Sequence, residues 1–241
     1  MSDRPTVLVP IRVLEGESIH DGVPELLADA HVVLLGYHVI PEQTPPGQAR
    51  MQFEEQATAR MDELESLFED AGATVERRLV FTGEAQKTID RTIYEHDCLA
   101  VLVPDAVVAL EDVLVAVRGT VGIDRLARVV SGLFANADAD VTLYHVAGES
   151  ESDADAETLL SGLADRLAES GVDPDRIETR IERDRKPLAA IIEASDTFDA
   201  VVMGESDPSL ATFVFGMPAE QVAERFLGPV LIVQRERPES E

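Results

Sequence analysis

The chain has 241 residues, of which 47 are acidic and 20 are Lys or Arg, so its formal net charge is −27. This length allows one or two domains that bury a core without a disulfide or a structural metal. The single cysteine, Cys98, excludes a disulfide framework and a cysteine-cluster metal site. The negative charge argues against nucleic-acid binding, because phosphate backbones are held by clustered cations.

The apolar runs of the chain are too short to cross a bilayer. Runs such as 32–35 and 230–233 are only a few residues long, whereas a membrane helix needs about 20. The N-terminal residues lack the basic and apolar stretches of a signal peptide. We therefore expect a cytoplasmic protein with no membrane insertion.

Lysine is nearly absent from this chain. Lys87 and Lys186 stand against 18 arginines. A dense carboxylate shell with few lysines suits molar salt, where the Debye length falls to about 3 Å and self-repulsion is screened. The composition predicts a halophilic protein, and an acidic mesophilic protein is the alternative.

Short apolar runs alternate with longer amphipathic stretches, which is typical of an α/β fold. The runs show no polar alternation, so the strands should be buried on both faces, as in a parallel sheet. The first half is expected to contain, in chain order, strand 6–11, strand 32–37, helix 50–71, strand 75–80, helix 84–96 and strand 99–103.

The second half repeats this pattern. Val113 to Arg118 matches Val7 to Arg12, and Tyr144-His145-Val146 matches Tyr37-His38-Val39. The matching segments follow one another at offsets of 99 to 107 residues. Ordered matches at nearly one offset predict a tandem duplication, with the two halves packed as an internal pseudo-dimer.

The two predicted halves, 1–108 and 109–241, differ at their ends. The second half continues through a loop, a helix at 218–226 and a fifth strand at 230–234, whereas the first half has no such continuation. An uncovered apolar strand edge is an aggregation hazard. We therefore expect two chains to form a homodimer through this last strand.

Several short motifs follow one another in a fixed order along the chain. They are His38-Val39, His145-Val146, Val202-Met203-Gly204, Phe215-Gly216 and Gly228 to Val233. In this order they resemble the universal stress protein (UspA) family, in a tandem two-domain form of halophilic type. The resemblance implies an α/β fold of two tandem open, mostly parallel, doubly wound sheets with strand order 3-2-1-4-5, the first half being degenerate and lacking the fifth strand.

The resemblance also implies a ligand cleft at the carboxyl ends of the strands, where open α/β sheets bind their ligands. ATP-binding members carry glycines that let backbone N–H groups approach phosphate, and a hydroxyl beside them. Gly204 and Gly216 match the first and third of these glycines, but Asp207 and Met217 replace the second glycine and the hydroxyl residue. A carboxylate about 4 Å from a phosphate is repelled by about 1 kcal/mol even in water.

We therefore predict that the chain does not bind ATP. The alternative is that the second half binds ATP or another adenine nucleotide. The residues of such a nucleotide or anion cleft would be Arg118, Val146, Gly204 and Gly216.

Arginine replaces the family's first-strand aspartate in both halves, at Arg12 and at Arg118. A guanidinium there either clamps a carboxylate or phosphate of a ligand or pairs with an acid of the chain itself. His38 and His145 are interpreted as packing and hydrogen-bonding residues, since no second ligand is spaced for a metal site. Cys98 is expected to be inert core.

No set of catalytic residues is evident in the sequence. Ser131-Gly132 and Ser161-Gly162 lie in helical patterns without a nucleophile elbow, and neither lysine belongs to a Walker motif. We expect a non-enzymatic universal stress protein with a regulatory or stress-response role that acts on an unidentified protein partner. The alternatives are an adenine-nucleotide sensor and a regulatory companion of a membrane transporter, bound peripherally.

Overall fold

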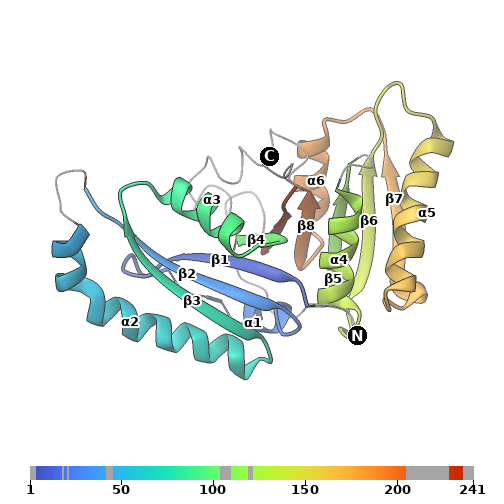
Figure 1. Ribbon diagram of the computed structural model, residues 1–241. Coiled ribbons are helices and arrows are strands. Elements are labelled where there is room, and N and C mark those ends of the chain that lie inside the picture. The colour runs from blue at the N-terminus through green and yellow to red at the C-terminus, as the bar shows by residue number, and fades with distance from the viewer. Residues whose placement is uncertain are drawn as a thin grey trace, which may run out of the picture.

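The computed structural model describes residues 4–17, 19–20, 22–41, 46–103, 110–118, 122–204 and 228–235. These residues form one sheet of nine strands in the order β3-β2-β1-β4-β9-β8-β5-β6-β7 (Figure 1). Neighbouring strands are parallel except for β4 and β9. The α/β class with helices on both faces of a mostly parallel sheet is as predicted.

The described part of the first half contributes four strands and three helices. The strands are β1 (Thr6–Arg12), β2 (His31–Val39), β3 (Thr74–Thr82) and β4 (Ala100–Val103). The helices are α1 (Val23–Leu26), α2 (Pro46–Asp70) and α3 (Ala85–Glu95). The predicted strands and both predicted helices are present, whereas α1 is a single turn that the hydrophobic pattern does not indicate.

The described part of the second half contributes five strands and three α-helices, with a 3-10 turn at Pro174–Arg176. The strands are β5 (Asp112–Val117), β6 (Asp140–Val146), β7 (Ile177–Glu182), β8 (Ala200–Gly204) and β9 (Val230–Val233). The helices are α4 (Ile123–Phe134), α5 (Asp153–Glu169) and α6 (Pro187–Ser195). The order β7-β6-β5-β8-β9 is the expected 3-2-1-4-5. The helix expected at 218–226 and the boundary between 108 and 109 lie outside the described residues.

The two faces of the sheet are packed differently. On one face, α1, α2, α4 and α5 share a single apolar core that runs through both halves. On the other face, α3 covers the first half and α6 covers the second, each over a separate core. Figure 1 shows α2 and α3 on opposite sides of the first-half strands.

Strand β9 corrects the prediction of two separate sheets. It runs parallel to β8 and antiparallel to β4, where Ala100 is opposite Val233 and Val103 is opposite Val230. The described residues of the first half include no fifth strand, so without β9 the strand β4 would leave its backbone N–H and C=O groups unpaired at an apolar edge. The expected homodimer through β9 is therefore wrong, because both edges of this strand are paired within the chain.

The side chains of β9 also connect the cores. Leu231 and Val233 enter the core that both halves share, and Val230 and Ile232 enter the core under α6. All four side chains are at most 2% exposed. Beyond the strand, the N–H of Gln234 donates to the carbonyl of Leu99 at 2.8 Å, which extends the pairing with the first half.

The helices in the described part of the chain include none that is long and apolar enough to cross a membrane.

Leu231→Ala is expected to destabilise the protein by about 2–5 kcal/mol, because it leaves a cavity where β9 joins the two halves. The matched control is Leu67→Ala, since Leu67 is 45% exposed on α2; it should cost less than about 1 kcal/mol. Urea unfolding in molar KCl measures both. Equal losses in the two variants would show that β9 does not hold the halves together.

Candidate functional site

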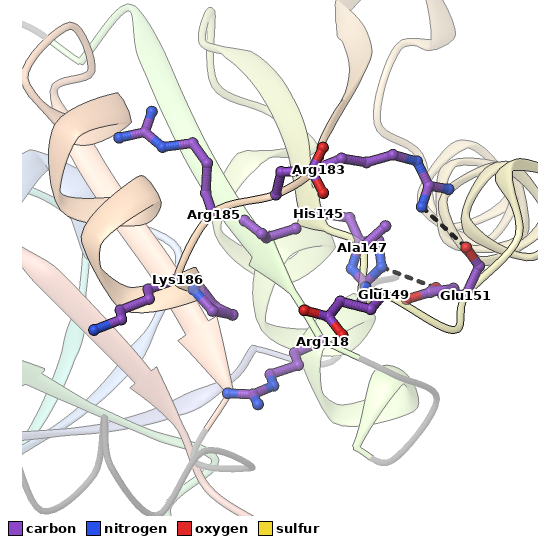
Figure 2. Close-up of a pocket in the computed structure, with 12 residues that line it drawn as sticks. Arg118, His145, Ala147, Glu149, Glu151, Arg183, Arg185 and Lys186 are labelled. Atoms are coloured by element: carbon purple, nitrogen blue, oxygen red, sulfur yellow. Dashed lines mark hydrogen bonds and ion pairs between the residues drawn. The ribbon is translucent and has the colours of Figure 1, made fainter.

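A cleft of about 790 Å³ opens at the carboxyl ends of β5, β6 and β7 (Figure 2). Ligands of open α/β sheets bind at this end of the strands, and the volume is within the range of small-molecule sites. The first turn of α6 forms one wall. The lining residues are Arg118, His145, Val146, Ala147, Gly148, Glu149, Glu151, Arg183, Asp184, Arg185, Lys186 and Pro187.

The charge of this cleft differs from that of the chain. Four cationic side chains and three acidic ones line it, whereas the whole chain carries −27. Three of the four cations, Arg183, Arg185 and Lys186, come from one short loop between β7 and α6. The cleft is therefore a local site of positive charge on an acidic protein.

His145, at the end of β6, is held on both ring nitrogens. Its Nδ1 donates to the carbonyl of Val117 at 2.8 Å, and its Nε2 lies 2.9 Å from Oε1 of Glu151. The side chain is only 3% exposed. These contacts confirm that His145 is a packing and hydrogen-bonding residue.

Glu151 closes the loop that follows β6. Its Oε2 accepts from the N–H of Gly148 at 3.1 Å while Oε1 contacts His145. Burial alone would raise the pKa of Glu151, but the hydrogen bonds from Gly148 and His145 outweigh it, and the pKa is lowered. The carboxylate is thus ionised at neutral pH, and its two oxygens contact His145 and Gly148.

Two of the cleft arginines take part in structural contacts. Arg183 donates to Oδ1 of Asp153 at 2.8 Å and to the carbonyl of Glu151 at 2.9 Å, which ties the end of β7 to the start of α5. Arg185 pairs with Glu182 at 3.5 Å and with Glu193. Figure 2 shows Arg183, Glu151 and His145 as one bonded group on one side of the cleft.

Lys186 and Arg118 contribute the other two cations. Lys186 is exposed, and within the described ranges it makes no ion pair. Arg118 is exposed at the end of β5. Both side chains lie on the side of the cleft away from the bonded group (Figure 2).

Tyr144 of β6 lies opposite Arg180 of β7, next to the strand ends that form the cleft. Burial, together with the negative charge of the nearby Glu182, raises the pKa of Tyr144 to about 12, so the phenol stays protonated. Arg180 lies over its ring, 5.4 Å from the centroid. Arg180 also pairs with Glu182 at 2.6 Å, so this layer supports the β7 side of the cleft.

The corresponding residues of the first half are used differently. Arg12 donates from Nε to the hydroxyl of Tyr37 at 3.2 Å and from Nη1 to Glu15 at 3.2 Å. Of the two interpretations of this arginine, pairing within the chain is the one confirmed. The ring of His38 packs at 5.5 Å from that of Phe53 and at 6.1 Å from that of Phe81.

The structure brings together part of the predicted site. Arg118 and Val146 line the same cleft. Gly204 ends β8, opposite Val233 of β9, and does not line the cleft. Gly216, Asp207 and Met217 lie outside the described residues.

The loop at 183–187 is the cleft-lining segment that sequence reasoning missed. A signal was present, because Arg-Asp-Arg-Lys-Pro holds three cations, including one of only two lysines, in a strongly acidic chain. Among the described residues, no group of three His, Cys, Asp or Glu side chains is placed to hold a metal ion. Cys98 is buried, and burial raises its pKa to about 12, so its thiol stays protonated.

Comparison with known proteins agrees with this fold. The model of the universal stress protein family matches residues 110–234, just over half of the chain. A universal stress protein from Archaeoglobus fulgidus DSM 4304 is similar in structure, with a TM-score of 0.61 and 16% identity over 95% of this chain and 96% of that chain. A functionally unknown protein from Pseudomonas aeruginosa PAO1 has a TM-score of 0.51 and 15% identity over 97% and 94%. No curated protein sequence matches the chain significantly.

Glu151→Gln is expected to lower the free energy of unfolding at pH 7 by about 1 kcal/mol, because a charge-assisted contact to His145 is lost. A carboxylate whose pKa is lowered by folding stabilises the protein above its ordinary pKa of about 4.3, and this contribution disappears as the pH falls through the lowered value. The difference between wild type and variant should therefore be present at neutral pH and shrink as the pH falls through the lowered pKa of Glu151. Urea unfolding in molar KCl, where surface repulsion is screened, measures it.

The control for this variant is Glu149→Gln, which removes a charge from the exposed neighbour that lines the same cleft. It should change stability by less than about 0.5 kcal/mol at every pH. A pH profile for Glu151→Gln that matches the Glu149→Gln profile would contradict the role given to the His145–Glu151 pair.

Proposed function

This chain belongs to the universal stress protein family, and we propose that it acts there as a non-enzymatic protein with a regulatory or stress-response role. The observation that carries the proposal is that both ring nitrogens of His145 contact other groups of the protein. A general base needs a ring nitrogen that can reach the substrate proton, and both nitrogens of His145 are engaged within the protein.

The other cleft residues support the same function. No serine, threonine or cysteine is among the residues that line the cleft in the described part of the chain. Covalent catalysis uses such a side chain next to a base. A cleft that can hold a small molecule but lacks these catalytic groups is suited to ligand recognition. The proposal also includes a cytoplasmic location and a protein partner that recognises the ligand-bound form of the chain.

The second candidate function is an adenine-nucleotide sensor. It is favoured by the four cationic side chains that line a cleft at the strand ends, because Arg and Lys bind phosphate oxygens. In this function the second half holds the nucleotide and hydrolyses it slowly or not at all.

Thermal unfolding in molar KCl with millimolar Mg-ATP, AMP or cyclic AMP, together with a phosphate-release assay, separates the two functions. A ligand at 100 times its dissociation constant stabilises a fold by about 2.7 kcal/mol, which raises the unfolding temperature of a protein of this size by roughly 5–10 °C. We expect no phosphate release and no shift with ATP. A shift of this size with one nucleotide would favour the sensor, and steady phosphate release would overturn the non-enzymatic proposal.

A further inference from the structure

Strand β7 is the last strand of the sheet, and its outer side pairs with no strand that the structure describes (Figure 1). Three successive residues in its middle, Glu178, Thr179 and Arg180, are exposed. Successive side chains of a strand point to opposite faces, so neither face of the sheet is covered at this point. The outer backbone groups of β7 are therefore open to a further strand.

The backbone groups that point outwards belong to Ile177, Thr179 and Ile181. The N–H of Ala147, which follows β6, donates to the carbonyl of Glu182 at 2.9 Å. Glu182 thus turns its backbone groups towards β6, and alternate residues of a strand turn theirs to opposite edges. The three odd-numbered residues therefore offer N–H and C=O groups along the open edge.

From these outward groups and the charges between them, we propose that two copies of the chain pair through antiparallel β7 strands, with a two-fold axis at Thr179. Thr179 then lies opposite Thr179 of the second copy, and Ile177 lies opposite Ile181 of the second copy. All of these residues turn their backbone groups outwards, so the two strands exchange hydrogen bonds at these positions. The contact uses the same surface of both copies, so the assembly closes as a dimer.

The side chains between these positions are complementary in charge. In this register Glu178 of each copy lies opposite Arg180 of the other. These are the positions without backbone hydrogen bonds, where Cα atoms are about 4.5 Å apart and side chains are closest. Within the described part of the chain, the side chain of Glu178 makes no ion pair or hydrogen bond, so the arginine of the second copy supplies its partner.

The charges also select this register over its neighbours. A shift of one strand by two residues in one direction places Glu178 opposite Glu178 of the second copy. The same shift in the other direction places Arg180 opposite Arg180. Like charges directly opposite each other destabilise a sheet, and a shift by one residue sets outward backbone groups against inward ones.

Contacts within the chain prepare both faces of β7 for this pairing. Arg180 pairs with Glu182 at 2.6 Å and lies over the ring of Tyr144, which holds the guanidinium on the face where Glu178 of the second copy arrives. On the other face, Ile177 and Ile181 are partly buried against the core that both halves share. Each isoleucine gains an isoleucine of the second copy as its cross-strand neighbour, so the dimer covers apolar surface as well.

The opposite end of the sheet does not offer the same surface. Strand β3 is the other outer strand, and its charged residues are Glu76, Arg77 and Arg78. All three pair within the chain. An unpaired charge with its complement two residues away is therefore a property of β7.

The test is the mass of the full chain in molar KCl, measured by sedimentation equilibrium over a range of concentrations. The first variant is Glu178→Arg, which places two arginines opposite each other on both sides of the axis. Its matched control is Glu157→Arg, the same change at an exposed residue of α5 whose side chain also has no partner among the described residues. The second variant is Arg180→Glu, which places two glutamates opposite each other.

We expect the wild type and the Glu157→Arg variant to reach twice the mass of the chain, which is 26.2 kDa. The dissociation constant should rise about tenfold or more in each β7 variant, because two attractive pairs become two repulsive ones. An equal mixture of the two β7 variants should dimerise as the wild type does, since every opposed pair in the mixed dimer again joins an arginine to a glutamate.

The unfolding temperature checks that each variant folds. Should Arg180→Glu unfold through loss of its contacts with Glu182 and Tyr144, the comparison of Glu178→Arg with Glu157→Arg decides alone. The interface would be overturned by a wild type that keeps the mass of one chain at about 100 μM, or by a Glu178→Arg variant that dimerises as tightly as Glu157→Arg. A mixture of folded β7 variants that does not recover the dimer would overturn it as well.

Discussion

The pairing of β9 with β4 is the constraint on which the rest of the structure depends. The first half ends its sheet at β4, an apolar strand with backbone groups on one edge that need partners. The fifth strand of the second half supplies them, so one strand of four residues completes both halves. Its side chains enter the shared core and the core under α6. Backbone pairing and apolar packing therefore act at the same four residues.

The nine-stranded sheet fixes where the cleft can form. Strands β5, β6 and β7 are parallel and in register, so the loops that follow them meet at one edge. The loops after β6 and β7 are held by polar contacts. Arg183 joins β7 to α5, and Glu151 joins His145 to Gly148. Among the described residues that line the cleft, Arg183 and Arg185 pair with nearby carboxylates, whereas Lys186 makes no ion pair.

The two halves show how equivalent residues acquire different roles. Arg12 bonds to Tyr37 and Glu15 at the end of β1, whereas Arg118 lines a cleft at the end of β5. His38 packs against the rings of Phe53 and Phe81, whereas His145 bonds to a carbonyl and a carboxylate. The local sequences are alike, and the neighbours brought by α2, β3 and the β6–α5 loop decide the outcome.

The sequence by itself determined the strands and the longer helices, because continuous apolar runs and helical spacing are local signals, and the resemblance to the universal stress protein family implied the order of strands within the second half. It also placed Arg118 and Val146 at strand ends. Only the tertiary structure decided that β9 pairs with β4, because pairing depends on which edges are left open once both halves have folded. The same holds for the cleft: Lys186 and Arg118 are far apart in the chain, and only the parallel register of the strands brings their loops to one edge of the sheet.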